Sequence, residues 1–180
     1  MHSRATSFLG LNLILLLLAG GHARAQAPTE YQIKAAFLFN FAKFVQWPER
    51  AFAQASSPMV IGVLGDNPFH DDLARTVRDK AVDEHPLVVR EFRSPAEATN
   101  CHILFICTSE KERLPGILGA LKGTSVLTVG EMERFTELGG MINFVLQGTK
   151  TRFQINNEAA ARAGLKISSK LLNLALRPGD

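Results

Sequence analysis

Two stretches of almost unbroken apolar side chains, residues 59–65 and 101–107, restrict most strongly what this chain of 180 residues can fold into. Each is as long as one strand, and neither alternates apolar with polar side chains. A strand formed there is therefore buried on both faces. Helix-start signals follow both stretches, at Asn67-Pro68 and at Ser109 to Glu112. Strands that alternate with helices favour a parallel sheet covered on both faces.

The rest of the chain extends this pattern into one domain. Its periodicity predicts helices over 30–46, 68–80 and 109–121, a short helix from Ser94, and helical segments after Asn156 and over 167–175. It predicts strands over 59–65, 87–92, 101–107, 124–129, 141–146 and 150–155, of which the last two form a hairpin. The predicted fold class is therefore α/β: a three-layer α/β/α sandwich with a mixed, mainly parallel sheet of about six strands.

The first 25 residues have the layout of a secretory signal peptide. Arg4 precedes an apolar run over residues 8–19, and Ala23-Arg24-Ala25 supplies the small residues of a cleavage site. The run is shorter than the roughly 20 residues of a spanning helix. We expect cleavage after Ala25, with Ala27 as the alternative site, an α/β domain over 26–180, and a periplasmic protein. An uncleaved N-terminal anchor is the other interpretation.

Most of the net positive charge of the chain comes from this predicted export signal. Its removal takes away Arg4 and Arg24, so that Lys+Arg falls from 20 to 18 against 17 Asp+Glu. A chain close to neutral gives no argument for nucleic-acid binding.

The two cysteines, Cys101 and Cys107, lie at the ends of one predicted strand. Six extended steps separate their Cα atoms by about 20 Å, whereas a disulfide needs about 4.4–6.8 Å. We therefore predict no bond between them. Two buried apolar side chains are the simpler interpretation, and thiols that pair between chains or sense oxidant are the alternative.

Motifs that carry chemistry are largely missing. Gly62 and Gly65 fit tight packing better than a nucleotide loop, because neither the dinucleotide nor the phosphate-loop pattern is complete. The cluster at His70 suits a solvated helix face, and His102, in an apolar strand, is expected to find a local hydrogen-bond partner. We predict no enzyme, no metal site and no cofactor. Paired carboxylates that meet only in the fold stay open, with Asp66 and Glu91 as the acids at predicted strand ends.

Two segments are candidates for contact with another protein. Residues 31–47 carry six aromatic rings, more than one helix face needs for its own packing. Residues 153–172 mix polar, small and aliphatic side chains around Gly164. Burial on most sides explains the first segment equally, and an ordinary broken helix explains the second; a docking surface is the alternative in both.

These segments resemble a known family. Residues 31–48, which read YQIKAAFLFNFAKFVQWP, are similar to the opening signature of the YfiR-like family of bacterial periplasmic proteins. Residues 61–69, 101–106 and 155–172 resemble further motifs of that family in the same order, so that the resemblance covers nearly all of 30–175.

The resemblance implies a periplasmic α/β/α domain, often a homodimer. It also implies a repressor that binds the periplasmic sensor region of an inner-membrane diguanylate cyclase, so that release raises cyclic di-GMP and promotes biofilm formation. Members under redox control use disulfides, and a chain with two cysteines in one strand departs from that pattern. Its signal would then be a ligand, a partner or an intermolecular thiol.

Two hypotheses follow for the site. A repressor would bind its partner, a cyclase or a sensor kinase, through Phe39, Trp47, Asn156, Glu158, Ala161, Leu165, Lys166 and Ile167. A small-molecule binding module that feeds a sensor kinase or transporter would instead hold its ligand at the carboxyl ends of the parallel strands. Its pocket would be formed by Asp66, Asn67, Thr108 and Ser109.

Overall fold

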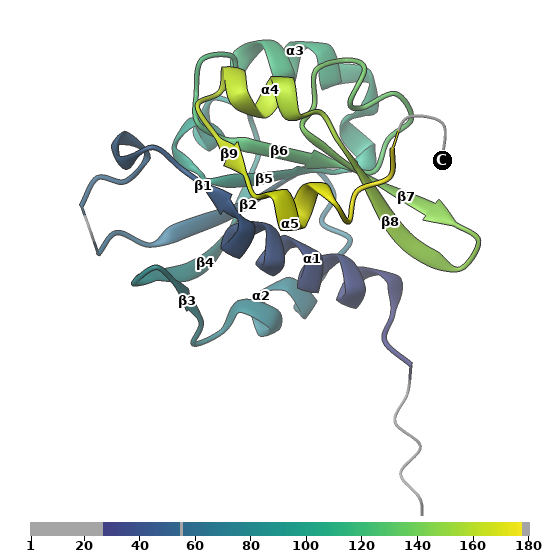
Figure 1. Cartoon of the computed structure of the whole chain (residues 1–180), viewed down its shortest axis with the longest axis horizontal. Coiled ribbons are helices and arrows are strands. Elements are labelled where there is room, and N and C mark those ends of the chain that lie inside the picture. Colours follow the sequence, from purple (N-terminus) through teal and green to yellow (C-terminus); the bar gives the residue numbers. More distant parts are fainter. Residues whose placement is uncertain (1–26, 55, 178–180) are drawn as a thin grey trace, which may run out of the picture.

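The computed structural model describes residues 27–54 and 56–177, so the predicted signal peptide lies outside the described residues. A seven-stranded sheet forms the centre of the domain (Figure 1). Neighbouring strands are parallel from the second to the sixth position, and the two outermost pairs are antiparallel. In spatial order the strands are β3 (Ala81–Val82), β4 (His85–Phe92), β2 (Met59–Leu64), β5 (Ile103–Ile106), β6 (Leu127–Gly130), β7 (Ile142–Gln147) and β8 (Lys150–Ile155).

Helices cover both faces of this sheet. The larger apolar core lies under α1 (Glu30–Phe44), α2 (Asp72–Val77), α4 (Asn157–Arg162) and α5 (Ser169–Leu172). The smaller core lies under α3 (Leu114–Ala120) and the 3₁₀ turn η2 (Glu97–Asn100), with η3 (Thr108–Arg113) leading into α3. The predicted α/β class and three-layer arrangement are confirmed.

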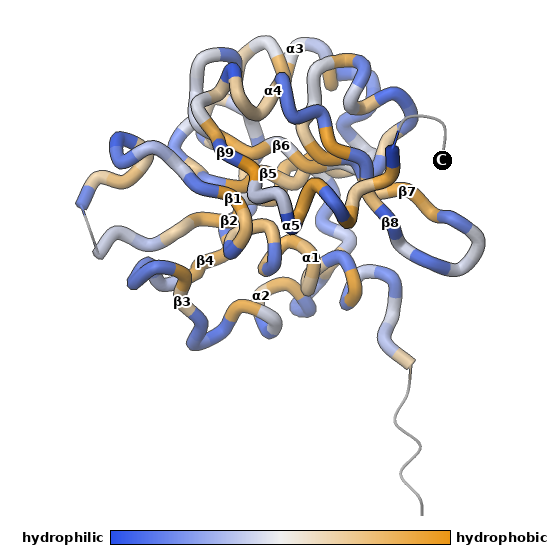
Figure 2. Tube along the Cα trace, viewed as in Figure 1, coloured by the Kyte–Doolittle hydropathy of each residue, from blue (hydrophilic) through white to orange (hydrophobic). Residues whose placement is uncertain are grey.

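The central strands explain why two covering layers are needed. Every residue of β2, β5 and β6 is buried, and Figure 2 shows their hydrophobic colour through the middle of the molecule. The seventh strand, β3, was not predicted. It pairs with β4 through a turn in which Asp83 and Glu84 have φ of 47° and 68°, and this turn lacks the Asn-Gly signal that usually marks such hairpins.

The chain around α1 and the C-terminal segment differs from the prediction. The first helix ends at Phe44 rather than at residue 46, and β1 (Val45–Gln46) pairs antiparallel with β9 (Lys166–Ile167). The expected helix over 167–175 is therefore only the short α5, which begins after Ser168. Gly164, at φ +78°, turns the chain out of α4 toward this ribbon.

Three predicted helix starts were also wrong. The helix expected from Pro68 begins at Asp72, because His70 has a left-handed φ of 48° that breaks the helical path. Ser94 donates to the Glu97 carboxylate at 2.8 Å, but only the short turn η2 follows. Ser109 does not cap a helix; its hydroxyl oxygen accepts a hydrogen bond from the Asp66 backbone N–H at 2.9 Å.

His102 has the local partners that its place in an apolar strand predicts. Its Nδ1 accepts a hydrogen bond from the Val60 backbone N–H at 3.0 Å, and its Nε2 lies 3.1 Å from the Ala51 carbonyl oxygen. The ring is therefore neutral, with the proton on Nε2. Burial lowers the pKa of His102 to about 4.

This arrangement predicts a specific loss of stability in acid. His102 becomes protonated near pH 6.5 in the unfolded chain and near pH 4 in the folded chain. The contribution of the neutral ring to the free energy of unfolding is therefore complete above pH 6.5 and is lost as the pH falls toward 4. Between pH 7 and 4 we expect a loss on the order of 2–3 kcal/mol from this group. Urea unfolding of the wild type and His102→Asn at both pH values measures it. Equal pH dependence in the two proteins would contradict the assignment.

Phe135 holds the loop after β6 against the sheet. Its ring is completely buried and lies between two glycines. A Cβ at Gly130 would come within 2.5 Å of the ring, and a Cβ at Gly140 within 2.2 Å. The loop that begins at Glu131 is therefore fixed at both of its ends.

Gly140→Ala is expected to lower the free energy of unfolding by about 1–3 kcal/mol, because the ring has no space to yield. Gly119→Ala, in α3, is the matched control: a Cβ there meets nothing within 4 Å. We expect the control to be neutral or more stable by up to about 1 kcal/mol. Denaturant unfolding of both variants checks this, and equal stability of the two would refute the packing argument.

Candidate functional site

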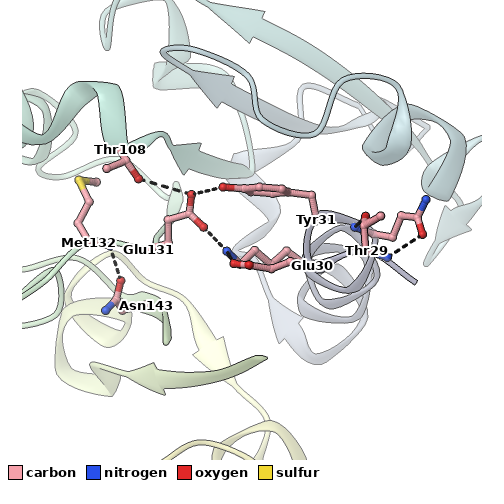
Figure 3. A network of polar contacts seen from close by, with 9 residues as sticks. Thr29, Glu30, Tyr31, Thr108, Glu131, Met132 and Asn143 are labelled. Carbon is pink, nitrogen blue, oxygen red and sulfur yellow. Dashed lines mark hydrogen bonds and ion pairs between the residues drawn. The ribbon is translucent and has the colours of Figure 1, made fainter. Parts of the chain in front are cut away.

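Glu131 is the centre of a polar cluster at the carboxyl edge of the sheet (Figure 3). It directly follows β6. Thr108 comes two residues after the end of the neighbouring strand β5, with Cys107 between them. The Glu131 Oε1 atom accepts a hydrogen bond from the Tyr31 hydroxyl at 3.0 Å and lies 3.5 Å from the Thr108 hydroxyl. Its Oε2 atom is ion-paired with Lys34.

Lys34 connects α1 to this edge of the sheet. It is 3% exposed and forms ion pairs with both Glu30 and Glu131. Glu30 is one helical turn before it, a spacing that places the two side chains on the same face. The Lys34 ammonium also lies 4.6 Å from the centre of the Tyr31 ring. A buried ammonium is thus neutralised by two carboxylates and faces an aromatic ring.

The start of α1 is fixed locally. The Thr29 hydroxyl accepts a hydrogen bond from the Gln32 backbone N–H at 3.3 Å, and the Gln32 side chain accepts one from the Thr29 N–H at 3.1 Å. This capping box holds the first turn, and with it Glu30 and Tyr31, in place.

The surroundings of Tyr31 favour the protonated form of its hydroxyl. Burial, together with the neighbouring Glu131 carboxylate, raises the pKa of the Tyr31 hydroxyl. The phenol therefore remains a hydrogen-bond donor at neutral pH. The cluster thus combines an ammonium that is ion-paired with two carboxylates and a phenol that donates a hydrogen bond to one of them.

A cleft of about 450 Å³ opens beside the cluster. Its wall includes Asn143 and Phe144 of β7, and the Asn143 Oδ1 accepts a hydrogen bond from the Met132 backbone N–H at 3.0 Å. Glu30 and Glu133, both exposed, lie at its rim. Three carboxylates against one lysine give the cleft a negative charge, which suits a cationic group.

The predicted ligand residues lie at this same edge. Ser109 and Asp66 are joined by a hydrogen bond, Thr108 faces Glu131, and the Asn67 side chain donates to Glu91 at 2.6 Å. Of these four residues only Thr108 lines the cleft.

Sequence reasoning missed Tyr31, Lys34 and Glu131. The available signals were a lysine among apolar residues of a helix and an acid two residues beyond the end of the predicted strand 124–129. Neither signal alone indicated that the two would pair.

The predicted partner residues divide into packed and exposed groups. Phe39 is half-buried beneath Lys80, whose ammonium lies 4.4 Å from the ring centre. Trp47 is half-buried and donates from its indole nitrogen to the His102 carbonyl at 3.1 Å. Both side chains therefore contribute to the packing of the domain itself.

The other predicted partner residues lie along α4 and β9. Asn156 caps α4, because its Oδ1 accepts from the Ala159 N–H at 2.9 Å, which confirms the predicted cap. Leu165 is buried and Ile167 is half-buried. Glu158, Ala161 and Lys166 are exposed, and we call these three residues the α4–β9 surface.

The two cysteines are free and buried at opposite ends of β5. Burial raises the pKa of each thiol to about 12, and nearby carboxylates, Glu131 first, add to the effect at Cys107. Thiolate, the reactive form, is therefore scarce at neutral pH.

The described part of the chain holds neither a candidate metal site nor a helix that could span a membrane. Within residues 27–54 and 56–177 no group of three or more His, Cys, Asp or Glu side chains is placed to hold a metal ion. Over the same residues no helix combines the length and apolar character needed to span a bilayer.

The chain folds as an α/β/α domain with a polar cluster and a cleft at the carboxyl edge of its sheet. A family model described as YfiR/HmsC-like matches residues 31–176, and the chain belongs to this family. The family is regulatory rather than catalytic, its members are generally periplasmic, and they work with membrane diguanylate cyclases.

A solved structure is similar in fold. It is a conserved domain protein from Vibrio cholerae O1 biovar El Tor strain N16961, with a TM-score of 0.56 and 12% identity. The match covers 82% of this chain and 59% of that chain, so this chain spans about three fifths of the similar protein's length. At this identity the likeness concerns the fold alone.

Removal of the buried lysine tests the cluster. Lys34→Met leaves Glu131, whose side chain is 11% exposed, without its cation, and we expect a loss on the order of 3 kcal/mol in the free energy of unfolding. The double variant Lys34→Met/Glu131→Gln should recover much of that loss, because no buried charge remains.

Arg162→Met is the matched control for this prediction. It breaks the exposed pair with Glu158, in which the closest atoms are 3.6 Å apart, so a loss below about 1 kcal/mol is expected. Urea unfolding of the four proteins gives these values. A double variant less stable than Lys34→Met would show that the charge of Glu131 is not what destabilises the single variant.

Proposed function

We propose that this protein is a periplasmic repressor that binds the periplasmic sensor region of an inner-membrane diguanylate cyclase, or of a related sensor enzyme, and keeps its catalytic domain inactive. The observation that carries the proposal is the family match over residues 31–176. A cleaved signal peptide over residues 1–25 would deliver the domain to the compartment in which that sensor region lies.

The α4–β9 surface is the contact we propose for the partner. Glu158 and Ala161 lie on the outer side of α4, whereas Ala159 and Ala160 point into the core. The small side chain of Ala161 on the outer side would allow a partner to approach this helix closely. Lys166 adds a positive charge at the adjacent end of the β1–β9 ribbon. We also propose that the protein is a homodimer, as the resemblance implies.

A second candidate function has its own support in the structure. The negatively charged cleft at Glu131 has a volume of about 450 Å³, within the usual range for small-molecule sites. A periplasmic binding module that feeds a sensor kinase or transporter would use this cleft for a ligand with a cationic group. Ligand binding that controls partner binding would combine the two functions.

A negative charge introduced on the α4–β9 surface tests the repressor function. Ala161→Glu places a carboxylate on the α4–β9 surface without reaching the core, so we expect cyclic di-GMP to rise to the level of a deletion strain while the melting temperature stays unchanged. Ala74→Glu, at an exposed position of α2, is the matched control and should leave cyclic di-GMP at the wild-type level. The readout is cyclic di-GMP measured by mass spectrometry in each strain.

The same experiment contains the outcome that would reject the proposal. If deletion of the whole gene leaves cyclic di-GMP unchanged, the protein does not repress a cyclase under those conditions. If deletion raises cyclic di-GMP and Ala161→Glu does not, repression stands and the contact surface is elsewhere.

A further inference from the structure

A second cleft lies at the opposite edge of the sheet, at the amino ends of the central strands. Its volume is about 690 Å³. It is bounded by the segment after β1, by η2, and by the loop that leads into β6; in Figure 1 this is the end from which the long segment between β1 and β2 projects. The residues that form its polar wall are Arg50, Ser57, Arg90, Asn100 and Thr124.

The charges of this cleft are all positive. Arg50 and Arg90 are the charged side chains among its described lining residues, and no Asp or Glu is among them. Over the described part of the chain, neither arginine forms an ion pair. Two guanidinium groups without carboxylate partners on one concave surface attract anions.

Uncharged donors complete the polar wall. The Ser57 hydroxyl oxygen accepts a hydrogen bond from the Gln54 N–H at 2.9 Å, so its own hydrogen is free to donate. The Asn100 side chain lines the cleft next to the start of β5. In contrast, the Thr124 hydroxyl already donates to the Leu121 carbonyl at 2.7 Å.

An aromatic stack makes the cleft rigid. The Phe52 ring lies between two imidazoles, 3.8 Å from His85 and 4.4 Å from His102, and is nearly parallel to both. His85 in turn contacts the Ser57 carbonyl oxygen through Nδ1 at 2.7 Å. These contacts hold the segment after β1 against the sheet, so the arginine at position 50 is anchored close by. Preorganisation of this kind lowers the cost of binding.

We propose that this cleft binds a small organic or inorganic oxyanion, such as a phosphate ester or a polycarboxylate, with Arg50 and Arg90 binding its charge and the edge of the Phe52 ring contributing to the wall. Guanidinium groups suit such ligands because their paired N–H groups match two oxygens of a phosphate or carboxylate. The site is distinct from the negatively charged cleft at Glu131 and does not depend on repression of a cyclase.

Trp47 supplies the signal for a binding experiment. It is the one tryptophan of the chain, and its indole nitrogen donates to the carbonyl of His102, which lines the cleft. Titration of the wild-type protein with inorganic phosphate, and separately with citrate, at constant ionic strength should change its fluorescence along a saturating curve. The probe that binds more tightly distinguishes phosphate from polycarboxylate chemistry.

Charge-removing variants decide whether the signal comes from this site. Arg50→Gln and Arg90→Gln should each weaken binding about tenfold or more. Arg78→Gln is the matched control, since it removes one positive charge at an exposed position after α2, and its affinity should equal that of the wild type. Circular dichroism confirms that each variant is folded.

Two results would overturn the proposal. One is the absence of a saturating change with both probes up to millimolar concentration. The other is an equal loss of affinity in Arg50→Gln, Arg90→Gln and Arg78→Gln, which would indicate general charge attraction rather than a site. Neither result bears on cyclic di-GMP control, so failure of this proposal and failure of the repressor function are separable.

Discussion

Complete burial of β2, β5 and β6 is the constraint on which the rest of the molecule depends. Strands without a polar face need a helical layer on each side, and the two apolar cores provide these layers. Most polar side chains consequently lie at the ends of the central strands and on the outer faces of the helices, and the buried exceptions, such as Lys34 and Thr128, have polar partners. The cleft at Glu131 and the cleft at Arg50 and Arg90 lie at such strand ends, which links the position of the candidate sites to the fold itself.

The two ends of the sheet differ in whether their charged side chains form ion pairs. At the carboxyl end, Lys34 forms ion pairs with two carboxylates, and α1 is thereby fixed to the loop after β6. At the amino end, Arg50 and Arg90 line a cleft without carboxylates. The first arrangement contributes to structure and leaves a negatively charged rim, whereas the second leaves cationic groups available to a ligand. The two ends are thus suited to ligands of opposite charge.

Position 164 connects the amino-end cleft to the proposed contact surface. A Cβ at Gly164 would lie 3.0 Å from the Arg50 guanidinium, so this arginine packs against the turn between α4 and β9. The α4–β9 surface and the segment after β1 are thus neighbours, and β1 pairs directly with β9. This adjacency gives a ligand at one site a physical route to influence a partner at the other.

The sequence predicted the parts of the fold that depend on local apolar patterns. The buried strands, their parallel direction, the hairpin of β7 and β8 and the Asn156 cap follow from residues that lie close together in the chain. The β1–β9 ribbon was missed because Val45 and Ile167 pair across more than 100 residues, and two residues are too few for a strand pattern. The Lys34–Glu131 pair was missed for the same reason, since each residue has an ordinary local explanation until the fold brings the two together.

The central claim is that the α4–β9 surface contacts a membrane signalling enzyme in the periplasm. Its most direct test is a photoreactive amino acid placed at position 161 in living cells, followed by identification of the cross-linked protein by mass spectrometry. From position 161 we expect a cross-link to the periplasmic part of an inner-membrane protein that carries a diguanylate cyclase or sensor-enzyme domain. From position 74 we expect no such cross-link. Recovery of the same membrane protein from both positions, or of no membrane protein from position 161, would contradict it.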